Sequence, residues 1–410
     1  MKNSVLYTER VFDSYEKRFL RAMAEKALRD PSDEKTREDI LREVREMLCY
    51  DNIPAPKIKI TAESEEKHGG ITLRHMQFSS WDHCYGEATL LIPDGNGPHP
   101  ALYICPGHGD GGRLYPKYQK MALLLARSGA AVLIADNLGQ GSREGFGHDD
   151  ATLPLTLGIT LQGMIVKESN AWIDWLRSLP FIDEGRIGAC GNSGGGTITM
   201  FLSALCPHLS AIASSGYPSE LAYVHRKEKK HCPCNLLKGC AHLADMWEIY
   251  STFAPKPLLL ELGKYDHYFP QDIFKRTARK VRGVYEKLSA ADKFSSAMTE
   301  TKHGWYEEDM AVILDFFARQ FGFTPTKDID PELLSDGLRF TYPPDAATTN
   351  DTAIAITGSN FCDILPLEHT FIPTVDGEAV NGEMLARPLF DSDPMRILAQ
   401  MEIALYKENK

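Results

Sequence analysis

The stretch IGACGNSGGGTI, residues 187–198, places Ser193 between Gly191 and Gly195 in the pattern G-x-S-x-G. An apolar run precedes the pattern and a helix-like stretch follows it, so the serine lies at a strand-to-helix turn. Such a turn holds a serine in a strained backbone conformation, and the flanking glycines let strand and helix approach closely. The N-terminus of the helix then faces the oxyanion formed in acyl transfer. The spacing predicts a nucleophilic serine, with an ordinary Gly-rich loop as the alternative.

Two later residues fit the base and the acid that such a serine needs. His303 follows an apolar run in TETKHGWYEE, and Asp266 follows PLLLELG in KYDHYFPQD. On a strand-turn-helix scaffold of this kind the partners follow the nucleophile in the order acid, then histidine. Each residue alone can be a solvated loop residue, but two matches in order after two predicted strands favour a triad with Ser193. Asp272 is the fallback acid, although its position suits the first turn of the next helix.

The loop CPGHGDGG, residues 105–112, is suited to forming an oxyanion hole. Its glycines let the backbone come close to a substrate, and backbone N–H groups stabilise the negative oxygen of a tetrahedral intermediate. We predict the N–H of His108 and the N–H of Gly194, the residue after the nucleophile, as the two donors. A plain turn is the alternative for this loop.

Six near-continuous apolar runs alternate with helical stretches through the middle of the chain. Such runs are typical of strands buried on both faces, and their alternation with helices predicts a mainly parallel central sheet flanked by helices. The predicted strands are 101–105, 130–136, 186–190, 211–215, 257–263 and 295–301, and the predicted helices are 117–128, 161–179, 195–206, 270–288 and 306–320. Three β-like segments, KIKITA, ITLRHMQF and EATLLIPDG, precede them.

The same patterns divide the chain into three parts. Residues 1–57 carry apolar residues at three-to-four spacing, which predicts an N-terminal helical extension. Residues 58–321 form the predicted catalytic domain, with a charged insertion near the cleft at 217–252. Residues 322–410 form a C-terminal appendage of mixed structure, which we expect to cap the cleft or to mediate self-association into a homo-oligomer.

Together these motifs resemble the α/β-hydrolase superfamily, and within it the branch related to acetyl xylan esterases and dienelactone hydrolases. The segments that carry the resemblance are PGHGDGG (106–112), DNLGQGS (136–142), GNSGGG (191–196) and the stretch 245–270 that leads to the acid. Pro106 departs from the pattern, since many relatives have a histidine there. The resemblance, which covers residues 58–320, implies an α/β-hydrolase fold and an esterase-type activity. It also implies a triad of Ser193, Asp266 and His303 that requires no cofactor.

Composition and charge exclude several classes of protein. The chain has 410 residues, 43% of them hydrophobic, which is enough to build a large core. Its net charge of -11 would repel a nucleic-acid backbone or an anionic membrane surface. The N-terminus lacks the apolar core of a signal peptide, and no run approaches the roughly 20 apolar residues of a membrane helix, so we predict a cytoplasmic protein. Nine cysteines without regular spacing indicate reduced thiols.

The insertion contains a cluster of soft metal ligands in HCPCNLLKGCAH. Its members are His231, Cys232, Cys234, Cys240 and His242. Zinc binds four such ligands in a tetrahedron, but Cys-x-Cys is tighter than the usual spacing and no second Cys pair follows at finger distance. We therefore predict buried cysteines in a cleft-lining loop, and no metal.

Substrate and activity class rest on fewer observations. We expect a small-molecule ester or an acylated saccharide as substrate, bound beside Tyr217, Tyr268 and Trp305, although aromatic residues more commonly pack in cores. A serine peptidase of the same fold is the first alternative, but such enzymes usually add a large N-terminal propeller or an acidic site for the substrate amine. A catalytically inactive binding protein is the second, and the presence of all three triad residues argues against it.

Overall fold

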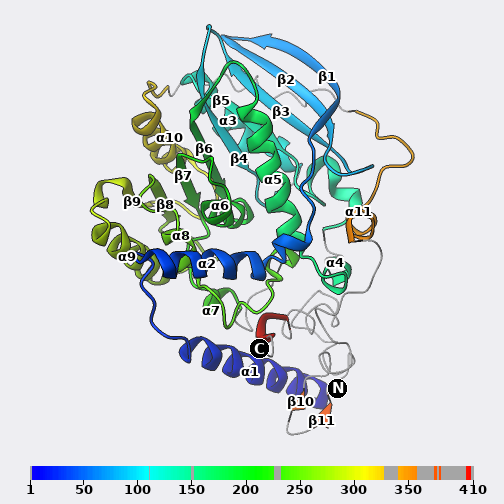
Figure 1. Cartoon of the computed structure of the whole chain (residues 1–410), viewed down its shortest axis with the longest axis vertical. Coiled ribbons are helices and arrows are strands. Elements are labelled where there is room, and N and C mark those ends of the chain that lie inside the picture. The colour runs from blue at the N-terminus through cyan, green and yellow to red at the C-terminus, as the bar shows by residue number, and fades with distance from the viewer. Residues whose placement is uncertain are drawn as a thin grey trace.

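The sheet at the centre of the molecule has nine strands in the order β1-β2-β3-β5-β4-β6-β7-β8-β9 in the computed structural model (Figure 1). The strands are β1 (Lys59–His68), β2 (Ile71–Ser79), β3 (Tyr85–Pro93), β4 (His99–Cys105), β5 (Ala131–Ala135), β6 (Ile182–Asn192), β7 (Ala211–Ser215), β8 (Leu258–Gly263) and β9 (Phe294–Thr299). The six strands from β5 to β9 in this order pair in parallel, and β1, β2 and β3 form an antiparallel meander joined to β5. This arrangement confirms the predicted α/β fold with a mainly parallel sheet.

The structure describes residues 2–109, 111–148, 152–225, 232–326, 340–357, 374–375, 378–379 and 403–407. The described helices are α1 (Lys2–Ala24), α2 (Glu34–Met47), α3 (Pro116–Arg127), α4 (Thr152–Thr156), α5 (Leu161–Arg177), α6 (Gly194–Leu205), α7 (Leu221–Val224), α8 (Met246–Ser251), α9 (Gln271–Lys287), α10 (Glu307–Phe321) and α11 (Thr349–Thr357). A short hairpin joins β10 (Thr374–Val375) to β11 (Glu378–Ala379).

Helices cover both faces of the sheet and create two cores. Along β4, Ala101 and Tyr103 enter the core beneath α5 and α6, whereas Leu102 and Ile104 enter the core beneath α3 and α10. Successive residues of a strand point to opposite faces, so a strand buried on both faces needs apolar residues at every position. This is why β4 reads as an unbroken apolar run.

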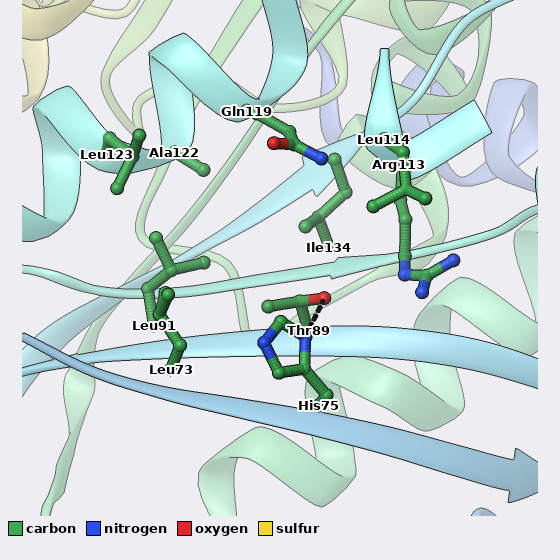
Figure 2. Close-up of a pocket in the computed structure, with 10 residues that line it drawn as sticks. All are labelled: Leu73, His75, Thr89, Leu91, Arg113, Leu114, Gln119, Ala122, Leu123 and Ile134. Carbon is green, nitrogen blue, oxygen red and sulfur yellow. Dashed lines mark hydrogen bonds between the residues drawn. The ribbon is translucent and has the colours of Figure 1, made fainter. Parts of the chain in front are cut away.

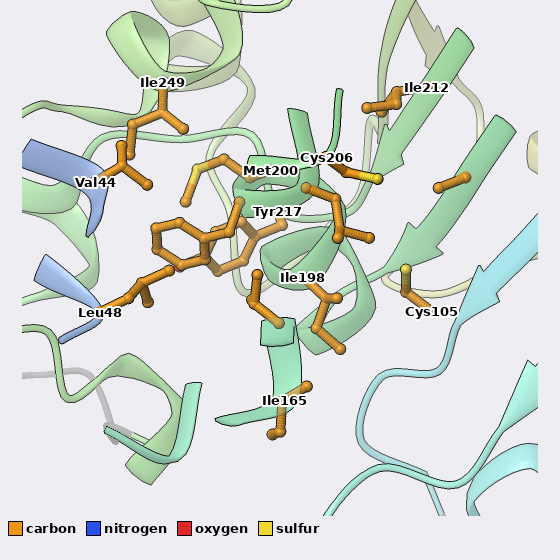
Figure 3. Packing of buried hydrophobic residues seen from close by; sticks show 14 of the residues in the cluster. Val44, Leu48, Cys105, Ile165, Ile198, Met200, Cys206, Ile212, Tyr217 and Ile249 are labelled. Carbon is orange, nitrogen blue, oxygen red and sulfur yellow. The ribbon is translucent and has the colours of Figure 1, made fainter. Parts of the chain in front are cut away.

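Helix α2 packs on the outside of α6, the helix that follows the predicted nucleophile. Val44 and Leu48, at the C-terminal end of α2, lie in the same cluster as Ile198 and Met200 of α6 (Figure 3). All four are 3% exposed or less. Full burial of one such aliphatic side chain contributes about 1.5–3 kcal/mol, so this contact holds α6 firmly against the sheet.

The insertion between β7 and β8 lies against both ends of the chain (Figure 1). The Tyr15 hydroxyl in α1 lies 3.1 Å from His225 Nδ1, and the Lys238 N–H donates to the Met47 carbonyl at 3.0 Å. The Gly239 N–H donates to the carbonyl of Ile403 at 2.7 Å. The insertion is therefore fastened between the N-terminal helices and the last described residues.

Candidate active site

Ser193 occupies the turn between β6 and α6, and its backbone is strained there. Its φ of 58° and ψ of -121° lie in a region that non-glycine residues rarely adopt. The Ser193 N–H donates to the Ser215 carbonyl at 3.0 Å, which ties the turn to the end of β7. A Cβ on Gly195 would collide with the carbonyl group of Cys105, which explains a glycine two residues after the serine. The turn has the backbone geometry of a nucleophile elbow.

Asp266 and His303 are in direct contact at the ends of β8 and β9. Asp266 Oδ2 lies 2.7 Å from His303 Nδ1, and Asp266 Oδ1 accepts the N–H groups of Tyr268 at 2.7 Å and Phe269 at 3.0 Å. The Asp266 side chain is 1% exposed and that of His303 is 14% exposed. Both carboxylate oxygens are thus engaged, and the contact at Nδ1 fixes the orientation of the imidazole. The fallback acid, Asp272, instead pairs with Arg276 on the surface of α9.

The end of β7 lies between the serine and the histidine. Gly216 follows β7 with a φ of +59°, and a Cβ placed on it would lie 3.5 Å from His303 Cε1. The preceding carbonyl, that of Ser215, accepts the Ser193 N–H. Because β6, β7, β8 and β9 are successive neighbours in the sheet, their carboxyl ends bring Ser193, Asp266 and His303 to one edge.

The backbone of the loop after β4 lies against the N-terminus of α6. A Cβ on Gly107 would lie 3.0 Å from the Gly195 nitrogen, so only glycine fits there without displacement. The Gly107 N–H donates to the Tyr118 hydroxyl at 2.9 Å, and the Pro106 carbonyl accepts Asn137 Nδ2 at 2.7 Å. These bonds hold the residue before His108 beside the first N–H groups of α6, which have no acceptor within the helix.

A buried ion-pair network fixes the loops that follow β4 and β5. Arg113 donates to Asp136 Oδ2 at 2.5 Å and to Glu87 Oε2 at 2.8 Å, and all three side chains are buried. A Cβ on Gly141 would collide with the Asp136 carboxylate, which accounts for one glycine of the DNLGQGS motif. The motif therefore has a structural role in holding the loop after β5.

Figure 2 shows a cavity that lies beside this network, with Arg113 in its lining. Its volume is about 30 Å³, and His75, Thr89, Arg113 and Gln119 provide its polar lining. Such a volume has room for a water molecule, whereas small-molecule sites measure about 300–1,000 Å³. The cavity is too small to be the site of an ester substrate.

Of the three aromatic residues predicted to bind substrate, only Tyr268 is exposed. Tyr268 is 51% exposed, and the centroid of its ring lies 4.7 Å from the centroid of the His303 ring. Tyr217 is 3% exposed and donates its hydroxyl to Asn235 at 3.0 Å, and Trp305 is 1% exposed and packs on Tyr118. The rings of Tyr217 and Trp305 thus lie in the core, and a role for them in substrate binding stays a prediction.

A buried pair of acids, Glu261 and Asp309, lies next to the end of β7. The hydroxyl of Ser215 lies 2.5 Å from Glu261 Oε2 in β8, the hydroxyl of Thr299 lies 3.1 Å from Glu261 Oε1, and Thr299 Oγ1 also contacts Asp309. Burial, and then the neighbouring Asp309, raises the pKa of Glu261 well above its ordinary value. Glu261 therefore binds its proton more tightly than an ordinary carboxyl group does, and no sequence pattern reveals it because it lies within an apolar strand.

Four side chains of the types that can bind a metal ion form a cluster at the loop that follows β4. His108, His148, Cys232 and Cys234 offer ligand atoms that all lie within 4.8 Å of one another. A Cβ on Gly194 would lie 2.7 Å from His108 Nδ1, so this imidazole covers the residue that follows Ser193. The set joins side chains from three separate loops.

This cluster differs from the one considered from the sequence. Cys240 Sγ lies 3.5 Å from His225 Nε2, His242 Nε2 lies 3.2 Å from the Leu405 carbonyl, and His231 lies outside the described residues. Only Cys232 and Cys234 are shared between the two sets. Burial alone would raise the pKa of the Cys232 thiol, but hydrogen bonds from Cys234 and the two histidines lower it well below its ordinary value.

Residues 87–304, more than half of the chain, match the sequence profile of the X-Pro dipeptidyl-peptidase family, S15. The chain belongs to this family. This S15-family chain is 24% identical over 220 residues to the Bacillus subtilis protein named "Putative hydrolase YtaP", a match that covers 50% of this chain and 74% of that protein.

Solved structures share the fold at low sequence identity. Methylesterase BT1017 has a TM-score of 0.63 at 22% identity, covering 86% of this chain and 79% of its own. A "putative acetyl xylan esterase" from Bacteroides fragilis has a TM-score of 0.55 at 20% identity, covering 66% and 77%. These structures confirm the predicted fold, and the family match with the hydrolase relative confirms the prediction of an enzyme of the serine hydrolase type.

None of the helices in the described ranges is both long and apolar enough to cross a membrane. The cytoplasmic location, the domain boundaries and the homo-oligomer stay predictions.

Proposed function

We propose that this protein is a carboxylic ester hydrolase that uses Ser193 as nucleophile, His303 as general base and Asp266 as the residue that orients the base. The observation that carries the proposal is the 2.7 Å contact between Asp266 Oδ2 and His303 Nδ1, at the same edge of the sheet as the strained Ser193 turn. A carboxylate held by two backbone N–H groups and aimed at Nδ1 keeps the proton on that nitrogen. The other ring nitrogen, Nε2, is then free of a proton and suited to act as a base.

The reaction follows from this arrangement. Ser193 Oγ attacks the ester carbonyl carbon while His303 Nε2 takes its proton, and the negative oxygen accepts the N–H groups of Gly194 and His108. The imidazolium then gives its proton to the leaving alcohol as the C–O bond breaks, which leaves an acyl group on Ser193. Water attacks that acyl group with His303 again as base, and the acid is released.

The substrate class we propose is an acetylated or otherwise acylated carbohydrate. Two of the fold neighbours carry the names of a methylesterase and an acetyl xylan esterase. The exposed Tyr268 ring beside His303 supports the same class, because an aromatic face at a wet surface can stack on an apolar face of a sugar. Tyr265, three residues earlier in the chain, is also exposed, at 56%.

Cleavage of peptides after proline is the alternative, and the name of the family favours it. The same triad chemistry serves both reactions, so the discrimination lies in the substrate pocket. Hydrolysis of Xaa-Pro nitroanilides by the purified protein, compared with hydrolysis of nitrophenyl acetate, separates the two.

The experiment that tests the proposal compares wild-type protein with Ser193→Ala on nitrophenyl esters from acetate to octanoate. We expect activity that falls with chain length and that is lost in Ser193→Ala, while Ser178→Ala on the exposed end of α5 leaves it unchanged. Hydrolysis of the Xaa-Pro nitroanilide without hydrolysis of the esters would show that the protein is a peptidase and not an esterase. Equal background rates in wild type and Ser193→Ala on both substrates would indicate a binding protein that has kept the fold.

A further inference from the structure

Three loops that are distant in sequence bring two histidines and two cysteines together. His108 follows β4, His148 lies in the loop after β5, and Cys232 and Cys234 belong to the insertion between β7 and β8. Nothing in the proposed ester hydrolysis uses the side chains of these four residues. Their grouping therefore needs a separate explanation.

The distances within the cluster are close to those of a tetrahedral metal site. With Zn–N of about 2.0–2.1 Å and Zn–S of about 2.3 Å, the ligand atoms of a tetrahedron lie about 3.3 to 3.8 Å apart. The Nε2 atoms of His108 and His148 are 3.1 Å apart, and Cys232 Sγ lies 2.9 Å from the first and 3.1 Å from the second. Cys234 Sγ lies 3.8 Å from His108 Nε2. Small adjustments of these side chains would place all four atoms around one ion.

The orientation of His148 is the second observation that points to a metal. His148 Nδ1 lies 3.2 Å from the Leu138 carbonyl. A histidine that binds a metal almost always donates its other ring N–H to a carbonyl or carboxylate, which fixes the tautomer and the direction of the ring. Here that bond would leave Nε2 unprotonated and directed at the cluster.

The backbone on both sides of the cluster is also fastened. The Cys232 carbonyl accepts the Asn235 N–H at 2.8 Å, and Asn235 Oδ1 accepts the hydroxyl of the buried Tyr217 at 3.0 Å. On the other side, the Gly147 carbonyl accepts the Thr349 hydroxyl at 2.7 Å. Ligands on backbone held in this way lose less conformational entropy when a metal binds than ligands on free loops would.

We propose that His108 Nε2, His148 Nε2, Cys232 Sγ and Cys234 Sγ bind one Zn²⁺ ion. Two thiolates and two imidazoles are a donor set that zinc prefers, and four protein ligands fill its tetrahedron without an open position. A closed set is the mark of a structural site, so the ion holds the fold and does not activate water. The proposal stands whether or not the protein is an esterase.

The position of His108 gives the ion a specific role. Its imidazole lies over Gly194, and its backbone N–H is one of the two proposed oxyanion donors. An ion that holds the His108 side chain against the insertion also holds this stretch of backbone beside the Ser193 turn. His148 and the two cysteines are then positioning residues, since they act on the reaction only through the oxyanion loop.

The first experiment measures the metal content of protein purified without added metal, by plasma mass spectrometry. We expect close to one zinc per chain in wild-type protein and in Ser193→Ala, which separates this proposal from the proposed function. Cys232→Ser, Cys234→Ser and His148→Gln each remove one ligand, and we expect at least a tenfold loss of bound zinc. The matched controls, Cys240→Ala and His242→Gln, change the same insertion outside the cluster and should keep the ion.

A second measurement on wild-type protein keeps the test independent of how the variants fold. Zinc is removed with a chelator and Co²⁺ is added, and two thiolate ligands should give the absorption of thiolate-bound tetrahedral cobalt. The proposal is overturned if wild-type protein holds less than about a tenth of an equivalent of zinc and gives no such cobalt spectrum. A disulfide between Cys232 and Cys234 in the purified protein, or full zinc content in the ligand variants, would overturn it equally.

Discussion

Asp266→Asn is the change that probes the proposed triad with least disturbance. In the structure, Asp266 Oδ1 accepts two backbone N–H groups and Oδ2 contacts His303 Nδ1. An asparagine keeps both backbone bonds only when its amide oxygen occupies the Oδ1 position. Its NH₂ group then faces Nδ1, which must act as an acceptor, so the ring proton moves to Nε2. A histidine that carries its proton on Nε2 cannot take one from Ser193.

The size of the effect follows from the loss of the base. The reverse orientation of the amide would place its NH₂ against two N–H donors and lose two hydrogen bonds of about 1 kcal/mol each, so the wrong tautomer prevails. In a serine protease the equivalent change lowers kcat by about 10⁴, which corresponds to about 5 kcal/mol. We expect a loss of the same order here, with KM little changed because Asp266 is buried away from the substrate.

The assay is hydrolysis of nitrophenyl acetate, with thermal unfolding to verify that each variant folds. Asp272→Asn is the matched control: it makes the same chemical change in the same segment, on a side chain that is 70% exposed and pairs with Arg276. We expect it to retain wild-type activity. If Asp266→Asn kept more than a tenth of the wild-type kcat, or if Asp272→Asn lost activity instead, the assignment of the acid would be refuted.

Two further predictions concern stability. Arg143→Met should lower the free energy of unfolding, measured in urea, by about 3–5 kcal/mol, because the buried Glu168 carboxylate loses the two hydrogen bonds at 2.7 and 3.1 Å that it accepts from Arg143. Arg42→Met on the surface should change it by less than about 0.5 kcal/mol. Equal effects of the two substitutions would contradict this prediction. Glu261 keeps its proton in the folded state at pH values where the unfolded carboxyl, with a pKa near 4.5, has lost it, so the folded state binds more protons and stability falls as the pH rises above that value. Glu261→Gln should remove this part of the pH dependence of stability, which is at most about 1.4 kcal/mol per pH unit. The prediction is disproved if the free energy of unfolding changes by the same amount between pH 5 and pH 8 in the wild type and in the variant.

The parallel strands could be predicted because burial on both faces leaves a simple pattern. Residues 101–105 and 211–215 are apolar or small at nearly every position, and each is bounded by turn residues. The structure has β4 and β7 at these places. The order of strands in the sheet could not be obtained in this way, since it depends on crossovers that periodicity does not encode.

The residues at strand ends were easier to predict than the direction of their side chains. Ser193 and His303 lie at one edge because they follow strands of one parallel sheet. Tyr217 lies two residues beyond the end of β7, and Trp305 lies two residues beyond His303. The ring of Tyr217 nevertheless packs into one core and the ring of Trp305 into the other. Proximity in sequence to a site residue does not give side-chain direction, which depends on loop backbone that has no period.

The histidine and cysteine cluster escaped prediction for a different reason. A search for metal ligands by spacing finds ligands that share one loop, so it overlooked His108 and His148 and selected His231, Cys232, Cys234, Cys240 and His242. Yet a parallel sheet gathers at one edge every loop that leaves a carboxyl strand end, whatever the distance between those loops in the chain. His108 leaves β4 and His148 lies in the loop that leaves its neighbour β5. Once the fold is inferred, ligand residues should therefore be counted over all the strand-end loops of one edge, and on that count this chain presents a complete Cys₂His₂ set.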